Sequence, residues 1–402
     1  MIVASSSPDV AERWAEPTPF WAVSRQIAER YGTPFYLYFP EHAVRSFEAL
    51  SEAAEAWGAH GVAYSLKTNR LTAILCDLER VGALVEVVSA WELRQARKAG
   101  FPADRIIFNG PLKPKHDLHS VVRDPPLTIN ADSSEELHVL RELAGELQTV
   151  LGVGVRVCPP HIDGVWSRFG MELDNGELDA ALDLIEASPG LALRCVHIHL
   201  GTQVHETRRY REVVGMARRL WDRRAFPATV RLDIGGGFPY EHDRPFAEQS
   251  FSPRKFFGEL TDAWGDRVRP ALLLEPGRYV AAPAMAIVSR VLSRKPRTGE
   301  PSIIVLDSGT NHNVMAAFYD HLWSFQQTDA EGEYRFCGPL CMEDDVLSGR
   351  RYSPLPVCGD LVATLNAGAY SLALLREFIQ PAPPVFAVRP GGVYERLDSV
   401  DR

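Results

Sequence analysis

Lys67 is the residue with the clearest potential for chemistry, because it ends the short apolar segment 63–67, which reads AYSLK. An ammonium group is costly to bury without a partner. Burial lowers the pKa of a lysine and makes its amine nucleophilic, as a lysine that forms Schiff bases requires. The alternative is a lysine that closes a strand at the protein surface, so other residues must decide between the two.

Two further segments carry groups that could bind a charged ligand. Gly235, Gly236 and Gly237 follow the apolar segment 229–234, and successive glycines let backbone N–H groups approach a phosphate closely. A tight turn without a ligand would have the same sequence. Glu275 ends another apolar run and needs a buried partner there, while Arg278 suits planar recognition of a phosphate or carboxylate. A structural salt bridge between these two residues is the alternative.

In their order along the chain, these segments resemble the fold-type III pyridoxal-phosphate (PLP) decarboxylases, the group of diaminopimelate, ornithine and arginine decarboxylases. The resemblance extends from about Thr33 to about Val388, and includes HIHLGTQ at 197–203, CMEDD at 341–345 and GAY at 368–370. It implies a PLP cofactor, a small-molecule amino-acid substrate and a homodimer with shared active sites. It also implies an α/β fold: a (β/α)8 TIM-like barrel joined to a mostly antiparallel β domain, as in alanine racemase.

The resemblance implies a role for each site residue. Lys67 would form the Schiff base with PLP, Glu275 would bond the pyridinium nitrogen, and His199 would stack on the ring. The position before Gly201 favours His199 over His197 as the catalytic histidine, and Thr202 keeps the hydroxyl that reaches the phosphate. The other predicted cofactor contacts are Gly236, Gly237, Gly277, Arg278 and Tyr370.

Cys341 resembles the cysteine that this family places in the active site of the partner subunit, where its thiol protonates Cα after CO2 leaves, a general-acid role. Asp345 keeps the family's spacing of four residues from this cysteine. Glu86 would orient Lys67 or His199, whereas Glu92 reads as a surface charge on a helix. The segment SRFG at 167–170 matches the family's loop after the fifth strand.

Two departures from the family pattern bear on the substrate. Met342 stands where a Glu or Asp receives the distal ammonium, and Met315 stands where an Arg binds the distal carboxylate of diaminopimelate. Losing one charge-assisted hydrogen bond costs roughly 1.5–3 kcal/mol. We therefore expect an amino acid other than meso-diaminopimelate, with a larger or conjugated side chain. The predicted substrate contacts are Arg278, Tyr319, Met342, Asp345 and Tyr370.

The elements that must position these residues alternate between short apolar strands and amphipathic helices. Eight such strands indicate a (β/α)8 barrel, although an open doubly wound sheet has the same rhythm. Polar residues fall at or just after strand ends, which is the catalytic face of such a barrel; they are Lys67, Ser89, Asn109, Asp132, His199, Gly235 and Glu275. The predicted strands are 61–66, 84–88, 105–108, 127–130, 154–157, 193–199, 229–234 and 271–275.

A second, β-rich region begins after residue 279. Its predicted strands are 286–292, 302–306, 355–357, 361–365 and 385–388. The resemblance assigns the first 40 residues to the same region, so the predicted domains are a barrel at 41–280 and a β domain at 1–40 with 281–402. Helices are expected at 20–32, 41–57, 71–81 and 90–98, and a strand at 35–38.

Composition narrows the class of protein. The net charge of −9 argues against a nucleic-acid partner, and no apolar run approaches the roughly 20 residues that span a bilayer. Residues 1–19 lack the basic start of a secretory signal. The six cysteines have no metal-ligand spacing, so we expect no metal site and a reducing, cytoplasmic setting.

These observations predict a PLP-dependent amino-acid decarboxylase, a carboxy-lyase that works through the Lys67 Schiff base and protonation by Cys341. Three alternatives remain open. They are a diaminopimelate decarboxylase with a rearranged distal site, a racemase or epimerase of the same fold, and a non-catalytic regulator that resembles a decarboxylase. Retention of Lys67, Glu275 and Cys341 argues against the regulator.

Overall fold

Eight parallel strands close into a barrel, which confirms the predicted fold and excludes the open sheet. The computed structural model describes residues 20–158, 167–240, 251–325, 331–352 and 355–397. Each barrel strand pairs with its neighbours in the chain, and β9 closes the circle against β2. The strands are β2 (His60–Ser65), β3 (Leu84–Val87), β4 (Ile106–Phe108), β5 (Thr128–Ala131), β6 (Leu151–Val157), β7 (Leu191–Ile198), β8 (Arg231–Asp233) and β9 (Leu272–Leu274).

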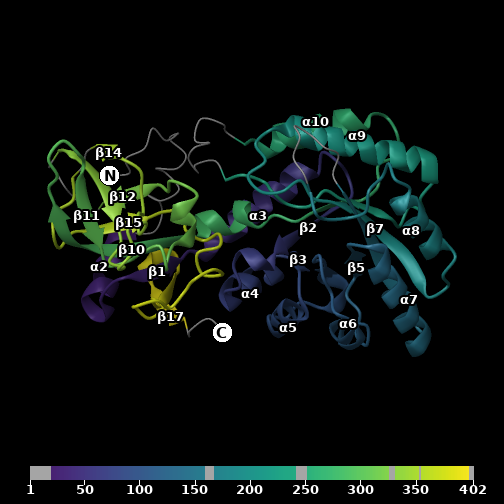
Figure 1. The fold of residues 1–402 in the computed structure, drawn as a ribbon, viewed down its shortest axis with the longest axis horizontal. Helices are drawn as coiled ribbons and strands as arrows, with labels where there is room; N and C mark the ends of the chain where they lie inside the picture. The colour runs from purple at the N-terminus through teal and green to yellow at the C-terminus, as the bar shows by residue number, and fades with distance from the viewer. Residues whose placement is uncertain (1–19, 159–166, 241–250, 326–330, 353–354, 398–402) are drawn as a thin grey trace.

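Helices surround the barrel (Figure 1), and their buried apolar side chains join its core. Ser89, Ser133 and Ser252 cap three of these helices, because each hydroxyl accepts the N–H of the residue three positions later. The helices are α3 (Pro40–Ala54), α4 (Thr72–Arg80), α5 (Ala90–Lys98), α6 (Lys115–Val121), α7 (Ser134–Leu147), α8 (Glu177–Glu186), α9 (Thr207–Arg224), α10 (Pro253–Trp264) and α11 (Arg278–Ala281). α3 ends three residues before the predicted end at 57.

The barrel interior changes from apolar to polar along the strands. Its apolar part is a small cluster of Ala63, Ile107, Cys195 and Leu273. Because every second residue of a strand points to the same side, the next inward position on each strand lies two residues later, nearer the carboxyl end. Those positions hold Ser65, Asn109, His197 and Glu275. A layer of polar side chains at the carboxyl ends of the strands therefore lies next to the apolar cluster inside the barrel.

The second region is a mixed sheet of nine strands, in which six strand pairs are antiparallel and two are parallel. The predicted strand at 355–357 is wrong, because this segment has no strand and Pro356 cannot donate to a ladder. Four short strands were not predicted: β12, β13, β14 and β17. The nine are β1 (Phe35–Tyr38), β10 (Met285–Lys295), β11 (Ser302–Leu306), β12 (Trp323–Phe325), β13 (Glu333–Cys337), β14 (Arg351–Tyr352), β15 (Leu361–Thr364), β16 (Val385–Val388) and β17 (Tyr394–Leu397).

The N-terminal strand β1 lies inside this second sheet. It pairs antiparallel with β10, where Phe35 faces Val288, and parallel with β16, where Tyr36 faces Val385. Helix α2 (Phe20–Tyr31) packs on the same sheet through Phe20, Val23 and Ile27. The chain thus begins its described part in the β region, crosses to the barrel, and returns.

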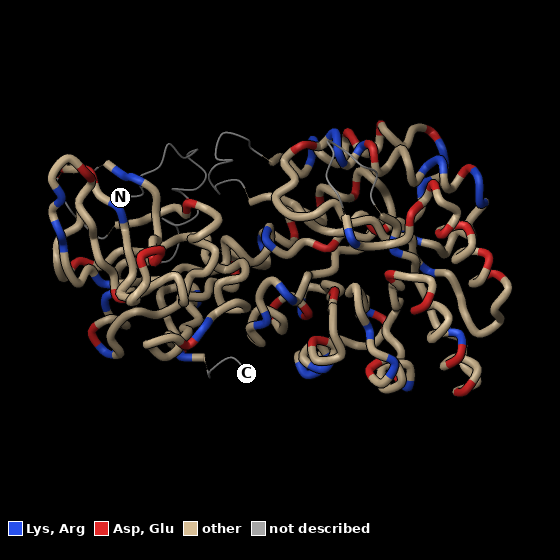
Figure 2. The backbone as a smooth tube through the Cα atoms, in the orientation of Figure 1, with Lys and Arg blue, Asp and Glu red and all other residues tan. Residues whose placement is uncertain are grey.

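Charged residues of both signs are spread over the outer helices and the β region (Figure 2). Within the described residues, no helix combines the length and apolarity that crossing a membrane requires.

Candidate active site

A cavity of about 280 Å³ opens among the carboxyl ends of the barrel strands. It brings together four of the residues singled out in the sequence, Lys67, Glu86, His199 and Glu275, although they are spread over more than 200 residues of chain. His197, the histidine that the sequence disfavours for the catalytic role, lines the same cavity. The remaining lining residues are Val88, Asn109, Gly110, Pro111, Arg156, Arg168 and Phe169.

Lys67 stands in the single 3-10 turn η1 (Leu66–Thr68), directly after β2. Its Nζ lies 3.0 Å from Glu86 Oε2, and 38% of its side-chain surface is exposed toward the cavity. The register of β2 with β3 places Ser65 opposite Glu86, which brings the carboxylate to the lysine. The expected lowering of the lysine pKa is wrong: burial lowers the pKa of Lys67, but the Glu86 and Glu275 carboxylates outweigh it and raise the pKa above its usual range.

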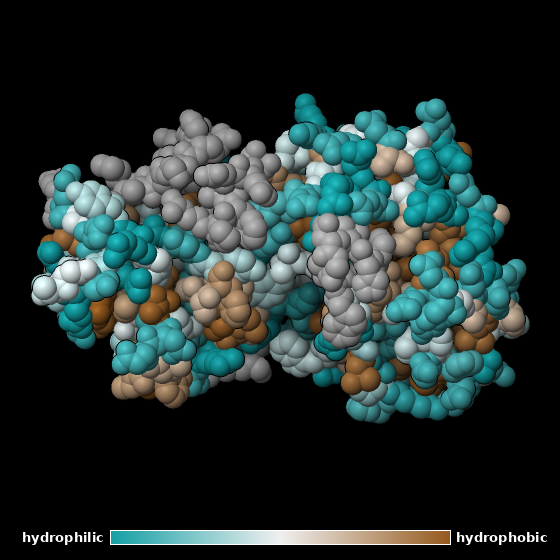
Figure 3. All heavy atoms as spheres, turned by 45° about the horizontal axis from the view of Figure 1, so that its top comes forward, coloured by the Kyte–Doolittle hydropathy of each residue, from teal (hydrophilic) through white to brown (hydrophobic). Residues whose placement is uncertain are grey.

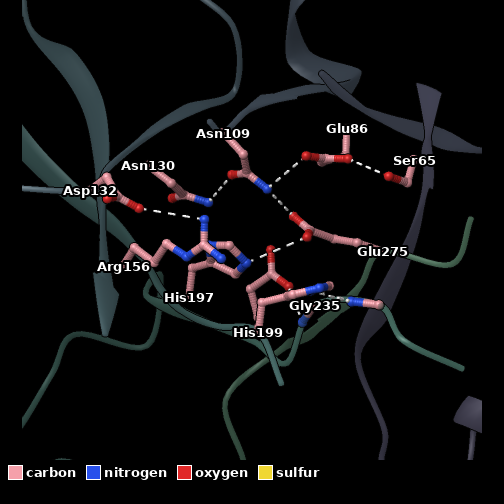
Figure 4. A network of polar contacts seen from close by, with 12 residues as sticks. Ser65, Glu86, Asn109, Asn130, Asp132, Arg156, His197, His199, Gly235 and Glu275 are labelled. Atoms are coloured by element: carbon pink, nitrogen blue, oxygen red, sulfur yellow. Dashed lines mark hydrogen bonds and ion pairs between the residues drawn. The ribbon is translucent and has the colours of Figure 1, made fainter. Parts of the chain in front are cut away.

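A chain of hydrogen bonds crosses the barrel interior and joins the two carboxylates (Figure 4). Ser65 Oγ donates to Glu86 at 2.6 Å, and the Asn109 amide donates to both Glu86 and Glu275. Asn130 Nδ2 in turn donates to Asn109 Oδ1 at 2.8 Å, which fixes the direction of the Asn109 amide. Each member is buried, so each hydrogen bond contributes to holding Glu275 in one orientation.

Glu275 is ionised although it is buried. Burial raises its pKa, but the His197 imidazole, whose Nε2 lies 3.4 Å from Glu275 Oε2, and the Lys67 ammonium bring the pKa of Glu275 below its usual range. The neighbouring Asp233 behaves in the opposite way: burial and the Glu275 carboxylate raise the pKa of Asp233 well above its usual value. The pKa values of the two neighbouring carboxyl groups are therefore shifted in opposite directions, and Glu275 is the one that favours the charged form.

His199 links the cavity to the glycine segment. Its Nδ1 accepts the N–H of Gly236 at 3.1 Å, and burial and the Lys67 ammonium lower the pKa of His199 to about 3, so the imidazole is neutral. A Cβ at Gly236 would lie 2.2 Å from the Glu275 carbonyl oxygen. Gly235 has φ +68°, which favours glycine. No larger residue fits this segment without moving the Glu275 or His199 strand end.

Arg278 and Tyr370 lie together on the side of the site that faces the β region. The Arg278 guanidinium carbon is 4.5 Å from the ring centroid of Tyr319 and 5.4 Å from that of Tyr370. The N–H of Tyr370 donates to the Thr68 carbonyl, one residue from Lys67. Tyr370 has φ +68°, a conformation that costs a non-glycine residue about 1–3 kcal/mol and is found most often at functional sites. Gly277 lies against Thr68, where a Cβ would be 2.0 Å from the hydroxyl oxygen.

Four other predicted site residues do not line this cavity. Thr202 is exposed in the loop after β7, and Cys341 and Met342 are exposed in the loop after β13. Asp345 is buried, and its carboxylate is already engaged: Oδ1 accepts the N–H and hydroxyl of Thr310, and Oδ2 accepts the N–H of Leu340. Within this chain the Asp345 carboxylate therefore holds the Cys341 loop, and its contact with a substrate stays a prediction.

The interior positions of Arg156, Asn130, Ser65 and Asp233 were not identified from the sequence. Arg156 lies 3.4 Å from Asp132, and its guanidinium is 4.5 Å from the ring centroid of Phe169. The Arg168 guanidinium lies 4.3 Å from the same ring centroid, so two guanidinium groups contact Phe169 at the cavity wall. The sequence feature that could have identified these residues is the two-residue spacing of polar side chains at the carboxyl ends of apolar strands.

Glu92 is buried, so its interpretation as a surface charge is wrong. It closes a capping box at the start of α5: its N–H donates to Ser89 Oγ, and its carboxylate accepts the N–H of Val88 at 2.8 Å. Burial raises the pKa of Glu92 to about 7.

Glu92→Gln is expected to stabilise the protein above pH 7. Between the ordinary carboxyl pKa and 7, the folded protein keeps the Glu92 proton and the unfolded chain does not, so the Glu92 contribution to stability falls as pH rises through this window. The glutamine oxygen can still accept the Val88 N–H. Urea unfolding should show a gain of about 1–3 kcal/mol at pH 8 and little change at pH 4.5.

Glu136→Gln is the matched control, because Glu136 occupies the same capping-box position in α7. Its carboxylate lies 2.9 Å from the buried Lys113 ammonium. Removing this charge leaves the lysine unpaired, so the variant should lose about 3–5 kcal/mol at pH 8. Equal responses of Glu92→Gln and Glu136→Gln at pH 8 would contradict the assigned charge states.

The comparisons with known proteins agree with this geometry. Residues 44–282 match the family model described as the pyridoxal binding domain of pyridoxal-dependent decarboxylases. The chain belongs to the pyridoxal-dependent decarboxylases. It is 30% identical to an L-glutamyl-[BtrI acyl-carrier protein] decarboxylase of Niallia circulans over 92% of both chains. It is also 30% identical to a diaminopimelate decarboxylase of Pseudomonas aeruginosa over 92% of this chain and 89% of that one.

The fold also matches solved structures of this family. Diaminopimelate decarboxylase from M. jannaschii in complex with L-lysine superposes with a TM-score of 0.84 at 24% identity, covering 94% of this chain and 93% of that one. The likeness covers the barrel and the β region together.

The residues of the cavity fit PLP. Lys67 would hold its carbonyl carbon, the ionised Glu275 carboxylate its protonated ring nitrogen, and the segment 235–237 its phosphate. The buried Thr68 hydroxyl has no hydrogen-bond partner among the described residues and stands one residue from Lys67, where a ligand would satisfy it. Among the described residues, His197, His199 and Glu275 also have metal-ligand atoms within 4.8 Å of one another. We interpret this group as part of the cofactor site, because the Lys67 ammonium beside Glu275 opposes a cation there.

Bound PLP supplies the electron sink for the pair of electrons left at Cα when the α-carboxylate departs as CO2. The residues of this chain provide the conditions for that step. Glu275 would keep a negative charge that holds a proton at the ring nitrogen, and the hydrogen bonds through Asn109 hold the carboxylate in place. Glu86 orients the Lys67 amine at the cavity floor. The neutral His199 adds no positive charge to the cavity.

Proposed function

We propose that this enzyme decarboxylates an amino acid whose side chain ends in a neutral conjugate, and does not accept meso-diaminopimelate. The observation that carries this proposal is the pair Met315 and Met342 at the two positions that bind distal charges in the diaminopimelate enzymes. Met315 is buried in the 3-10 turn η5 (Val314–Ala317), and Met342 is 45% exposed. A thioether supplies an adaptable apolar wall and no charge.

Glutamate joined through its side-chain carboxyl group as a thioester or amide has the required shape. Its α-amino and α-carboxylate groups are free for chemistry, and its distal end is neutral. The relative from Niallia circulans supports this class, because it is an L-glutamyl-[BtrI acyl-carrier protein] decarboxylase, which acts on a glutamyl group carried on a protein. Burying a neutral end against methionine avoids the cost of desolvating a charge.

We propose a homodimer in which Cys341 of one chain serves the cavity of the other and delivers a proton to Cα after CO2 has left. Cys341 is exposed and does not line the cavity of its own chain. The β region to which the Cys341 loop belongs has large exposed apolar side chains, which a partner would cover; they include Phe318, Met342, Phe378 and Ile379. The Phe378 segment is linked to the Cys341 loop through two neighbouring residues, because the Asn311 amide donates to the Phe378 carbonyl and the Thr310 N–H donates to Asp345.

A reducing, cytoplasmic setting is part of the same proposal. All six cysteines are free thiols, including the exposed Cys341 and Cys358. An exposed thiol that must carry a proton would be lost to disulfide formation under oxidising conditions.

The test of the proposed function is a CO2-release screen with the PLP-loaded enzyme. Its probes are meso-diaminopimelate, lysine, ornithine, free L-glutamate and the L-glutamyl γ-thioester of N-acetylcysteamine. We expect the thioester to exceed every free amino acid in kcat/KM by at least about 100-fold, since each unpaired distal charge costs a few kcal/mol. Efficient turnover of meso-diaminopimelate would instead assign a diaminopimelate decarboxylase, and racemisation without CO2 would assign a racemase.

The double variant Met315→Arg with Met342→Glu should move the preference back toward diaminopimelate. It restores one cation and one carboxylate, worth about 1.5–3 kcal/mol each when they pair with the distal groups. Activity on meso-diaminopimelate should rise at least about tenfold, and activity on the thioester should fall. The single variant Met216→Leu, a buried methionine of α9, is the control and should change neither ratio.

A further inference from the structure

We propose that the outward face of α9 is the docking surface for an acidic carrier protein that delivers the amino acid to this active site. This inference rests on the proposed function and names the partner that would hold the conjugate. α9 differs in charge from the rest of the molecule: the chain has a net charge of −9, whereas α9 contains seven arginines and two acidic residues. A local positive surface on an acidic protein is suited to selecting an acidic partner.

The arginines of α9 project away from the barrel. The inward face is apolar and buried, and includes Tyr210, Val214 and Leu220. The exposed residues Arg208, Arg211, Arg219 and Arg223 lie within about 120° of helix circumference at roughly 100° per residue, and the helix is about 27 Å long. The surface over α9 and α10 is largely hydrophilic, as Figure 3 shows at the upper right.

Part of this charge is not neutralised within the described chain. Arg208 pairs with Glu206 and Glu212, and Arg223 pairs with Asp179. No ion pair joins Arg211 or Arg219 to any described residue. These two side chains are therefore the natural contacts for acidic groups of another molecule.

The same helix begins at the catalytic face. The Tyr210 hydroxyl donates to the Gly236 carbonyl at 2.7 Å, and the N–H of Val204, just before α9, donates to the Gly237 carbonyl. Tyr210 also packs edge-on against Phe256 at 4.9 Å, which brings the exposed Arg254 of α10 to the same rim. A carrier on this face would sit beside the cavity, so a flexible arm could bring a tethered amino acid to Lys67.

Reversing the charge of two arginines on α9 tests carrier docking without changing the residues that carry out the reaction. The variant Arg211→Glu with Arg219→Glu leaves every residue of the cavity unchanged. Its control is Arg123→Glu with Arg141→Glu, two exposed arginines near α6 and α7, on the opposite side of the barrel in Figure 1. The probes are an acyl carrier protein loaded with L-glutamate and the small L-glutamyl thioester of N-acetylcysteamine.

With the loaded carrier, kcat/KM of the α9 variant should fall at least about tenfold, and the change should lie in KM. With the small thioester, the α9 variant and the unmodified enzyme should have the same kcat/KM. Raising salt from about 0.05 M to about 0.5 M should remove most of the difference. The control variant should behave as the unmodified enzyme with both probes. Binding of the phosphopantetheinylated carrier without an amino acid, followed by fluorescence anisotropy, should weaken in the α9 variant alone.

Three results would overturn the inference. One is that the α9 variant turns over and binds the loaded carrier as well as the control variant does. Another is an equal loss of activity on both probes. The third is binding of a DNA duplex that exceeds carrier binding and disappears in the α9 variant, which would assign the surface to nucleic acid. Absence of turnover of both thioesters by the unmodified enzyme would instead reject the proposed function itself.

Discussion

Lys67→Ala is expected to remove the visible absorbance of bound PLP and to lower kcat/KM by more than about 10³-fold, equivalent to about 4 kcal/mol of transition-state stabilisation. The reason is that Lys67 supplies the amine of the cavity, held 3.0 Å from Glu86 at the end of β2. Absorbance spectra of the purified protein with added PLP, together with CO2 release, measure both effects.

Lys115→Ala is the control for this prediction. Lys115 is an exposed lysine whose ammonium pairs with Glu142 on the outside of the barrel. It should keep the PLP absorbance and the full rate. A Lys67→Ala protein that retained both would show that another amine carries the cofactor.

Mixing two inactive variants should restore activity if the active site is shared between subunits. Lys67→Ala and Cys341→Ala subunits, allowed to exchange, form heterodimers in which one of two sites has both residues intact. An equal mixture should therefore regain about a quarter of the unmodified activity, because half of its dimers are heterodimers. The measurement is CO2 release before and after exchange, with each variant alone as the baseline.

Subunit exchange itself must be shown independently, for example by energy transfer between labelled subunits. Exchange without recovery would mean that Cys341 serves its own chain. As a companion variant, Asp345→Asn should slow the reaction without abolishing PLP absorbance, since the Asp345 carboxylate holds the Thr310 and Leu340 backbone around the Cys341 loop.

The barrel could be predicted because its pattern is local. Each strand is a short apolar run, each helix has one apolar face, and the order of the two fixes the class of fold. The small strands of the β region carry less information. β14 has two residues, Arg351 and Tyr352, and β12 has three, so neither shows an alternation that a sequence pattern can detect.

The charge states of the site could not be predicted from the chain alone. The pKa of Lys67 depends on Glu86, 19 residues away, which only the register of β2 with β3 brings to 3.0 Å. The burial of Glu92, by contrast, could have been inferred from the sequence. Ser89 and Glu92 have the spacing of a capping box, which places the glutamate against the helix start rather than in solvent.

The position of β1 has a consequence for synthesis on the ribosome. Its four residues Phe35–Tyr38 are entirely buried in the finished protein, yet Phe35 pairs with Val288 and Tyr36 with Val385. At about 5–20 residues per second, the roughly 250 residues up to Val288 take about 12–50 s to emerge, and the roughly 350 residues up to Val385 take about 17–70 s. Until then the apolar segment FYLY has no partner strands. The barrel strands β2 to β9 emerge before β10, so the barrel can close while this segment is still unpaired. Newly made chains should therefore depend on a chaperone that shields this segment until β10 and β16 have left the ribosome.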